Sequence, residues 1–248
     1  MSSDVVFISV SNIGCIDLTL NHLESIKRAG MTNYVAYAID SECYEVLKTK
    51  GYSVELIGRE DFKDFHDFGG DIFNNLSFLR YRVIHKLLTE NKTVWYLDVD
   101  TVVLRNLNQY VEVAKDSCDI ALQDDINMPC TGCMLWFPSA IPLVRKMAMI
   151  KDTEYNDQIY LNAFLRGGNF KFGMFDRGVF PNGLLYFLED TPPFEGIQKE
   201  FREFRKNRLS DIAFVHANWM IGLQTKIDAL KSKGLWFLRS ASENAESE

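Results

Sequence analysis

The sequence predicts an α/β fold built around a mostly parallel β-sheet. Through the first hundred residues, β-branched and aromatic segments of strand length alternate with segments that carry apolar residues at helical spacing. Two of the predicted helices are followed by glycines, Gly30 and Gly51, as is common where a helix ends. This alternation is typical of βαβ units, in which helices cover the faces of a parallel sheet.

Each element follows from its local pattern. Residues 5–10 are rich in valine and predict a buried strand, and the amphipathic segment 17–29 predicts the first helix. Further strands are expected at residues 34–39, 53–57, 93–97, 120–123 and 133–137. Further helices are expected at residues 41–50, 76–90 and 157–165, with Ser41 as the N-cap of the first of these. Charged and aromatic residues at 59–75 predict a long loop.

Composition narrows the class of protein. The 248 residues include 27 Lys and Arg against 34 Asp and Glu, which gives a formal net charge of -7. An acidic balance argues against a nucleic-acid-binding protein, because phosphate contacts need a basic surface. The five cysteines are odd in number and scattered, which favours reduced thiols and a cytoplasmic compartment over a disulfide framework.

We expect one domain over residues 1–239, followed by a disordered acidic tail at residues 240–248. No stretch approaches the roughly 20 apolar residues that span a bilayer, so no transmembrane segment is expected. The alternative to a cytoplasmic protein is a domain of a protein that is anchored elsewhere. The basic amphipathic segment 199–208 predicts a solvated helix face or, alternatively, a contact with an anionic membrane or another anionic partner.

The most informative segment is a strand that runs into two carboxylates. Asp98 and Asp100 follow the apolar strand 93–97, and side-chain alternation places both on one face, about 7 Å apart. Two such carboxylates repel each other unless a cation lies between them, and Mg²⁺ or Mn²⁺ prefers oxygen ligands. The simpler interpretation is a turn in which one aspartate caps backbone N–H groups, but the hydrophobic lead-in favours the metal.

Two reactions use this arrangement. In one, a metal neutralises the diphosphate that leaves a nucleotide sugar. In the other, Asp98 is the nucleophile of a phosphatase of the haloacid-dehalogenase type, whose Asp-x-Asp-x-Thr signature matches residues 98–101. Three strand–helix units precede the motif, and the next acidic pair, Asp124 and Asp125, follows closely. That context favours sugar transfer.

A distal segment supports the same chemistry. His216 follows a short apolar strand, and a neutral imidazole can complete a metal site that two carboxylates begin. Gly222 permits close approach of a phosphate, and Lys226 supplies a positive charge to it. The other histidines, His22, His66 and His85, are assigned to structural roles, with an acceptor contact as the alternative for His66.

These segments together resemble the nucleotide-diphospho-sugar transferase family, which includes plant cell-wall xylosyl- and arabinosyltransferases and is related to the retaining glycogenin-like and LgtC-like enzymes. The resemblance covers about residues 4–237. The matching blocks, in order, lie at residues 96–107, 130–134, 156–158, 180–183 and 216–226. One departure is Cys130, where the family often has asparagine.

The resemblance implies a GT-A fold, a nucleotide-binding mixed sheet flanked by helices. It also implies a metal-dependent transferase that moves a sugar from a nucleoside diphosphate, most often UDP, to a sugar or glycan hydroxyl, with retention of configuration. The alternative that is not an enzyme is a non-catalytic nucleotide-sugar-binding protein. Trp219 and Trp236 either stack on a sugar ring or pack in the core.

The resemblance also assigns roles to residues. Asp98, Asp100 and His216 would hold Mn²⁺ or Mg²⁺, while Gly222 and Lys226 would contact the donor diphosphate and Val99 would also belong to the donor-binding site. Asp157, Gln158 and Asp124 would act on or lie near the donor sugar. Ser9, Asn12 and Asp40 would cradle the nucleoside. A basic residue of the helix before the carboxylates would reach the donor, and of Arg80, Arg82 and Lys86 the best match is Lys86.

Overall fold

The computed structural model describes residues 5–66, 70–126, 128–151, 154–187 and 211–238. The segments 199–208 and 240–248, predicted as a basic helix and a tail, lie outside the described residues. Within the described ranges, no helix is both long enough and apolar enough to cross a membrane.

A seven-stranded mixed sheet forms the centre of the molecule, with strand order β3-β2-β1-β4-β7-β6-β8. Its strands are β1 Val5–Ser11, β2 Tyr34–Ala38, β3 Val54–Leu56, β4 Thr93–Leu97, β6 Ile120–Asp124, β7 Pro129–Trp136 and β8 Phe172–Met174. The strands β1 to β4 are mutually parallel, whereas β7 runs antiparallel to both β4 and β6. The first half of the chain therefore builds a parallel sheet, and the second half extends it with one reversed strand, β7, followed by β6 and β8, which again run in the direction of β4.

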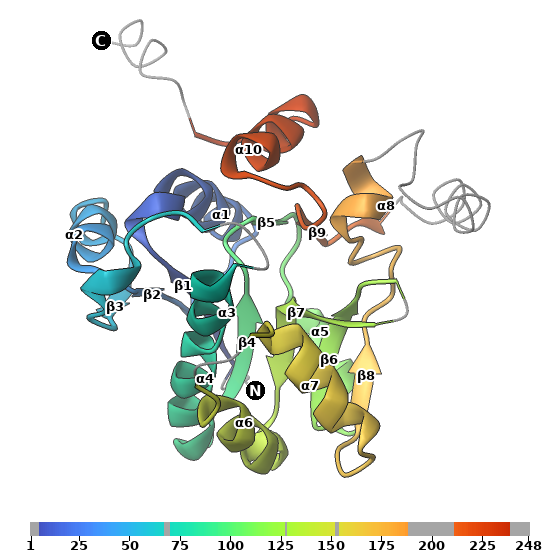
Figure 1. The fold of residues 1–248 in the computed structure, drawn as a ribbon. Coiled ribbons are helices and arrows are strands. Elements are labelled where there is room, and N and C mark those ends of the chain that lie inside the picture. The colour runs from blue at the N-terminus through green and yellow to red at the C-terminus, as the bar shows by residue number, and fades with distance from the viewer. Residues whose placement is uncertain (1–4, 67–69, 127, 152–153, 188–210, 239–248) are drawn as a thin grey trace, which may run out of the picture.

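A second, two-stranded sheet lies beyond the end of β4. It pairs β5 Thr101–Val103 with β9 Phe214–His216 in antiparallel register, so that Thr101 faces His216 across the ladder. Figure 1 shows this small sheet at the edge of the central one, between α1 and α8. The pairing joins residues that are more than a hundred positions apart in sequence.

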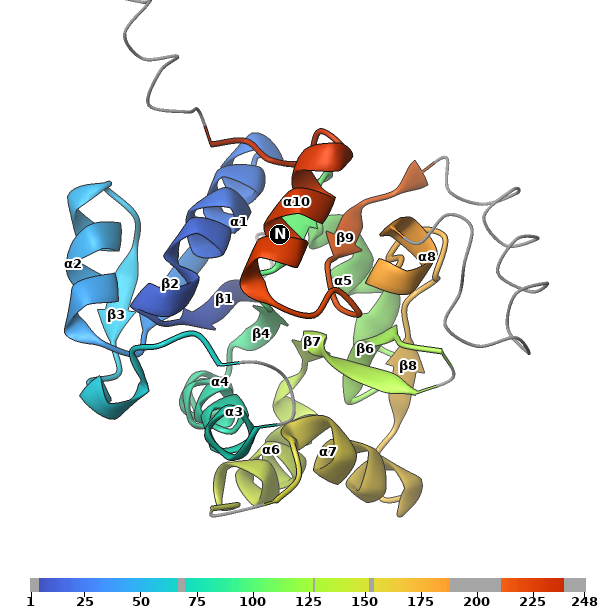
Figure 2. The ribbon, with the colours of Figure 1, turned by 45° about the horizontal axis from the view of Figure 1, so that its top comes forward.

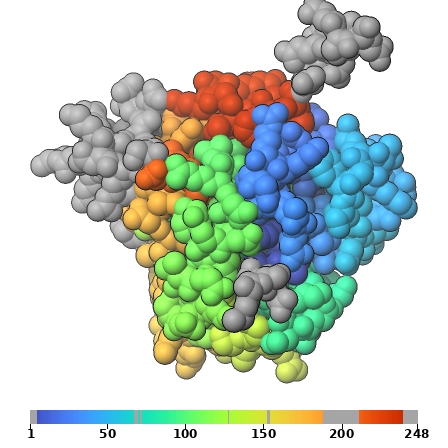
Figure 3. Space-filling model, turned by 180° about the vertical axis from the view of Figure 1, so that it is seen from behind, coloured from blue at the N-terminus to red at the C-terminus, as the bar shows by residue number. Residues whose placement is uncertain are grey.

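Helices cover both faces of the central sheet. They are α1 Ile16–Arg28, α2 Ser41–Thr49, α3 Asp71–Ser77, α4 Leu79–Thr89, α5 Asn108–Lys115, α6 Ile141–Ala148 and α7 Asp157–Arg166, while α8 Gly183–Phe187 and α10 Leu223–Ser232 pack with the small sheet. Figure 2 shows α4, α6 and α7 together on one side of the sheet. The opposite side, seen from behind in Figure 3, carries the blue surface around α1 and the green surface around α5.

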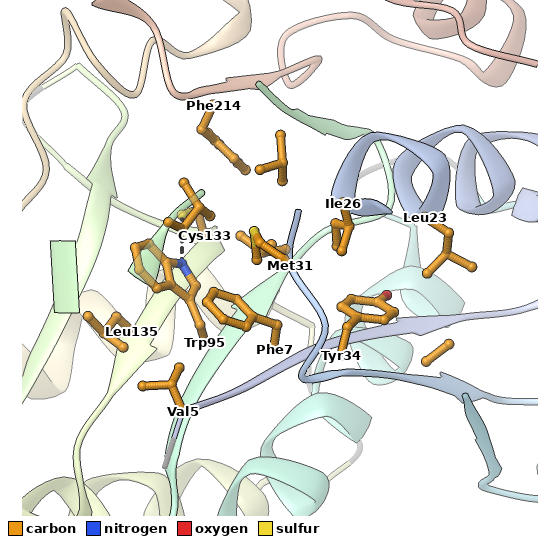
Figure 4. Packing of buried hydrophobic residues seen from close by; sticks show 14 of the residues in the cluster. Val5, Phe7, Leu23, Ile26, Met31, Tyr34, Trp95, Cys133, Leu135 and Phe214 are labelled. Carbon is orange, nitrogen blue, oxygen red and sulfur yellow. Dashed lines mark hydrogen bonds between the residues drawn. The ribbon is translucent and has the colours of Figure 1, made fainter. Parts of the chain in front are cut away.

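Side-chain alternation along the strands explains these two layers. In β1, Val5 and Phe7 pack with α1 and α2, while Val6 and Ile8 pack with α4 and α6. Figure 4 shows the first of these cores, in which Phe7 stacks on Trp95 at 5.6 Å between ring centroids. The indole N–H of Trp95 points at Cys133 Sγ, 3.4 Å away.

The structure corrects three expectations about the elements. Residues 59–75 are not a continuous loop, because a short 3₁₀ turn spans Glu60–Phe62 and α3 begins at Asp71. The helix expected at 76–90 is divided at Phe78 into α3 and α4. The N-cap of α2 is Asp40 instead of Ser41, because the Asp40 carboxylate accepts a hydrogen bond from the backbone N–H of Cys43.

His22 has the structural role that was predicted for it. The ring is fully buried on α1, with Nε2 3.0 Å from Ser9 Oγ and Nδ1 3.0 Å from the Thr101 carbonyl oxygen. It therefore ties α1 to β1 and β5. Burial lowers the pKa of His22 from its usual 6.5 to about 4.

This shift predicts a pH-dependent loss of stability. Between the folded pKa of about 4 and the usual 6.5, the unfolded chain binds a proton at His22 that the folded chain excludes. The contribution of neutral His22 to the free energy of unfolding is therefore complete above pH 6.5, and it is lost as the pH falls from 6.5 towards 4. We expect the free energy of unfolding of the wild type to fall by about 2 kcal/mol more than that of His22→Gln between pH 7 and pH 5. Urea titrations at both pH values measure this difference, and equal losses in the two proteins would contradict it.

Candidate functional site

The two carboxylates leave the end of β4 and are fixed by backbone contacts. The N–H of Asp98 donates to the Gly132 carbonyl at 2.8 Å, and Thr101 Oγ1 donates to the Asp98 carbonyl at 2.6 Å. The carbonyl of Asp100 accepts from the N–H of Ala217 at 2.9 Å. The loop between β4 and β5 is therefore held by β7 on one side and by the segment after β9 on the other.

His216 completes a cluster with these two residues. Its Nε2 lies 3.2 Å from Asp100 Oδ1 and 3.9 Å from Asp98 Oδ2. One ligand atom from each of Asp98, Asp100 and His216 lies within 4.8 Å of the others. The three side chains that the sequence predicted as metal ligands thus meet at one point.

Gln123, which the sequence analysis did not single out, orients the imidazole. Its Nε2 donates to the carbonyls of Phe180 and Pro181, so Oε1 is the atom that faces His216 Nδ1, at 2.8 Å. His216 must therefore donate from Nδ1, and in the neutral ring the lone pair of Nε2 faces the carboxylates. Gln123 lies in the middle of a buried strand, where no sequence signal separates it from a residue of the core.

Lys226 lies within the cluster. Its ammonium group, on α10, is 2.6 Å from Asp100 Oδ2 and 3.1 Å from the Ala217 carbonyl. Burial would raise the pKa of Asp100, but the positive charge of Lys226 beside it, together with the contact with His216, holds it well below its usual value. Gly222 begins α10 with φ of 89°, a backbone angle that favours glycine.

The structure brings Arg80, and not Lys86, to the carboxylates. Arg80 Nη1 donates to Asp98 Oδ1 at 3.0 Å and to the Thr131 carbonyl at 3.1 Å, and its side chain is only 10% exposed. Lys86 pairs with Glu55 at the surface and its side chain is 59% exposed. Six positions along a helix turn a side chain by about 120° around the axis, so the two residues lie on different faces of α4.

Asp157 and Gln158 lie at the start of α7, beside the same loop. Asp157 Oδ2 accepts from Tyr81 Oη at 2.8 Å, and Gln158 Oε1 accepts from the N–H of Thr131 at 3.4 Å. Asp157 is buried, and burial raises the pKa of its carboxyl group. The Arg80 guanidinium, 3.8 Å from Asp157 Oδ2, connects this pair to Asp98.

The remaining predicted donor contacts hold other parts of the chain. Ser9 Oγ donates to the Leu97 carbonyl at 2.6 Å, and the Asp40 carboxylate accepts from the N–H groups of Ile13 and Cys43, both at 2.9 Å. Both residues are buried. Asp124 binds Arg177 through both carboxylate oxygens, at 2.6 and 2.8 Å. Val99 packs against the small core around β5 and α10.

Asn12 differs from these residues. Its Nδ2 donates to the carbonyls of Phe62 and Asp64, both at 2.8 Å, which attaches the segment after β3 to the end of β1. Its Oδ1 is buried and has no hydrogen-bond partner within the described part of the chain. An unpartnered buried acceptor is unusual in a folded protein.

Comparison with known proteins gives the family. The model of the nucleotide-diphospho-sugar transferase family matches residues 29–230. The chain is 23% identical to the β-arabinofuranosyltransferase RAY1 of Arabidopsis thaliana over 93% of its own length and 47% of that protein, so it spans about half of this curated relative.

Solved structures agree on the fold. The galactosyltransferase LgtC, in complex with donor and acceptor sugar analogues, superposes with a TM-score of 0.57 at 14% identity, over 96% of this chain and 99% of LgtC. Mouse xyloside xylosyltransferase 1 superposes with a TM-score of 0.53 at 12% identity, over 86% of this chain and 97% of the mouse protein. The GT-A fold that the sequence suggested is thereby confirmed, and the chain belongs to the nucleotide-diphospho-sugar transferase family.

Proposed function

We propose that this chain is a metal-dependent glycosyltransferase that moves a sugar from UDP to a hydroxyl group of a sugar or glycan. The observation that carries the proposal is the meeting of Asp98, Asp100 and His216 at one point, with Lys226 beside them. A group of two carboxylates and an imidazole lone pair suits a cation, and the adjacent lysine suits a phosphate.

The geometry of the cluster fits a divalent ion. Around Mg²⁺ in octahedral geometry, neighbouring ligand atoms lie roughly 3 Å apart, which is close to the 3.2 Å between His216 Nε2 and Asp100 Oδ1. A Cβ atom at Gly132 would come within 2.2 Å of His216 Cε1 and 2.7 Å of Asp98 Oδ2. The space beside the ligands thus depends on the absence of a side chain. When bound, Mn²⁺ or Mg²⁺ would act as a Lewis acid on the departing diphosphate.

The chain's own residues would divide the remaining work. Lys226 would counter the charge of the diphosphate, and Gly222 would allow the backbone to approach it. Arg80, in place of Lys86, would hold Asp98 in position and face the donor. Asp157 and Gln158 would stabilise the positive charge that develops on the donor sugar, with Asp124 nearby.

The nucleoside would lie at the end of β1, where Asn12 Oδ1 can accept a hydrogen bond. Ser9 and Asp40 would support this pocket from behind through the contacts that they already make. The named relatives act as arabinofuranosyl-, galactosyl- and xylosyltransferases, which supports a pentose or hexose as the transferred sugar. Membership of the transferase family favours transfer over the phosphatase reaction.

The first test is whether nucleotide binding depends on the metal. We expect Asp98→Asn and Asp100→Asn each to weaken Mn²⁺-dependent UDP binding by more than about 100-fold, because each removes a charged metal ligand. Calorimetry with and without EDTA measures this, and Asp228→Asn, on the exposed side of α10, is the control. UDP binding that is unchanged in EDTA would overturn the metal role, and UDP binding without transfer from any nucleotide sugar would indicate a non-catalytic binding protein.

The second prediction concerns the space at Gly132. Gly132→Ala should weaken Mn²⁺ binding at least about tenfold, because the new methyl group displaces His216 and Asp98 from each other. The control is Gly173→Ala, whose Cβ would lie at an ordinary 3.6 Å from Cys118 Sγ. Titration of Mn²⁺ followed by electron paramagnetic resonance gives both affinities. Wild-type affinity in Gly132→Ala would show that the cluster is not the metal site.

The third prediction concerns stereochemistry. The resemblance to retaining enzymes supports retention, so the anomeric carbon of the product should keep the configuration of the donor. A thermal-shift panel of nucleotide sugars with Mn²⁺ identifies the donor, and NMR of the glycoside product identifies the configuration of the transferred sugar. An inverted product would contradict retention and would require a catalytic base.

A further inference from the structure

We propose that Trp219 and the carboxylate of Asp125 form a platform for the ring of a neutral acceptor sugar, beside the metal-binding cluster. This inference rests on the proposed function, whose acceptor it describes. It starts from an unusual combination: a tryptophan with 37% of its surface exposed, a left-handed backbone and an indole N–H held by a carboxylate.

The backbone conformation of Trp219 is costly. Its φ angle is 66°, in a region that glycine and asparagine adopt readily but tryptophan does not. Strain of this kind persists where the surroundings fix the chain and where the side chain serves a purpose. Part of the indole remains available to a ligand, because 37% of the residue is exposed.

The surroundings do fix this loop, which links β9 to α10. The N–H of Ala217 donates to the Asp100 carbonyl at 2.9 Å, and its carbonyl accepts from Lys226 Nζ at 3.1 Å. Next to it, Asn218 Oδ1 accepts from the N–H of Gly183 at 2.6 Å. The loop is thereby held between Asp100 on one side and the start of α8 on the other (Figure 2).

Asp125 collects three donors from this region on a single oxygen. Trp219 Nε1 lies 2.7 Å, Asn182 Nδ2 3.1 Å and Asn218 Nδ2 3.3 Å from Asp125 Oδ1. The indole ring is thus held at a fixed angle beside a carboxylate and two amides. An aromatic face next to planar polar groups is what a sugar ring requires, because its C–H face stacks and its hydroxyls need hydrogen bonds.

The position of the platform indicates an acceptor more than a donor. Cys130 Sγ lies 3.9 Å from His216 Nδ1 and 3.9 Å from Asn218 Nδ2, so one side chain separates the platform from the metal-binding histidine. The diphosphate is assigned to the other side of that histidine, where Lys226 lies. The carboxylate of Asp125 would repel an anionic sugar, which makes a neutral pentose or hexose the fitting ligand.

The test separates this platform from the proposed function. Wild-type protein with Mn²⁺ and UDP is mixed with a panel of methyl glycosides (xylopyranoside, glucopyranoside, galactopyranoside and arabinofuranoside), and saturation-transfer NMR reports binding. UDP affinity is measured on the same samples by calorimetry. We expect at least one glycoside to bind and Trp219→Gly to lose at least tenfold of that affinity while UDP affinity stays within twofold.

Three variants separate stacking from packing. Trp219→Phe keeps an aromatic face and should retain most of the glycoside binding. Ile221→Ala, at a residue of the same loop that is 76% exposed, is the matched control and should bind like the wild type. Trp219→Gly should melt at the wild-type temperature or above it, because glycine relieves the left-handed strain.

Each outcome decides one of the two ideas. Glycoside binding that depends on Trp219 supports the platform, even if UDP does not bind and the proposed function fails. UDP binding without any glycoside binding that depends on Trp219 overturns the platform and leaves the proposed function standing. A melting temperature several degrees lower in Trp219→Gly, with unchanged glycoside affinity, shows that the residue serves packing and also overturns it.

Discussion

The antiparallel pairing of β5 with β9 is the interaction on which the site depends. It sets Thr101 opposite His216 and so places a histidine from the last third of the chain beside carboxylates that leave β4. Since side chains alternate along a strand, a shift of one residue in this ladder would turn His216 to the opposite face. The loop after β9 then continues to Lys226, so the same pairing also delivers the lysine.

Once the carboxylates are brought together, their repulsion has to be offset, and the protein does this separately for each. Asp98 is held by the Arg80 guanidinium and the Tyr96 hydroxyl, at 3.0 and 2.5 Å. Asp100 is held by Lys226. Asp157 has no cation within hydrogen-bond distance among the described residues, and burial raises its pKa. The three carboxylates therefore differ in character within one pocket, because their surroundings differ.

The sequence predicted the parts of the site that are encoded locally. Asp98 and Asp100 could be assigned because an apolar strand leads directly into them, and His216 because a short strand and a glycine–lysine pair surround it. The choice between Lys86 and Arg80 could not be made from the sequence, because it depends on the rotation of α4 about its axis, which only packing fixes. The cap at Asp40 was missed for a similar reason: both Asp40 and Ser41 can cap a helix, and the contact with Ile13 N–H selects the aspartate.

Other features have no local signature at all. In the sequence, Gln123 looks like any other residue of a buried strand. Its role in orienting His216 becomes visible only in the structure, where its amide donates hydrogen bonds to the carbonyls of Phe180 and Pro181. The same holds for Gly132, whose missing side chain matters because two distant side chains occupy the space. Such constraints come from tertiary contacts between segments that are far apart in the chain.

The ion pairs of Arg80 and Lys226 have a consequence for how the protein is assembled. Two negative charges, on Asp98 and Asp100, are already matched by two positive charges within the pocket. A newly made chain therefore does not need a divalent ion to bring these aspartates together, in contrast to small domains that fold only around their metal. Under the proposed function, folding and metal binding would therefore be separate events, and the cluster would already be assembled when the ion and the nucleotide arrive.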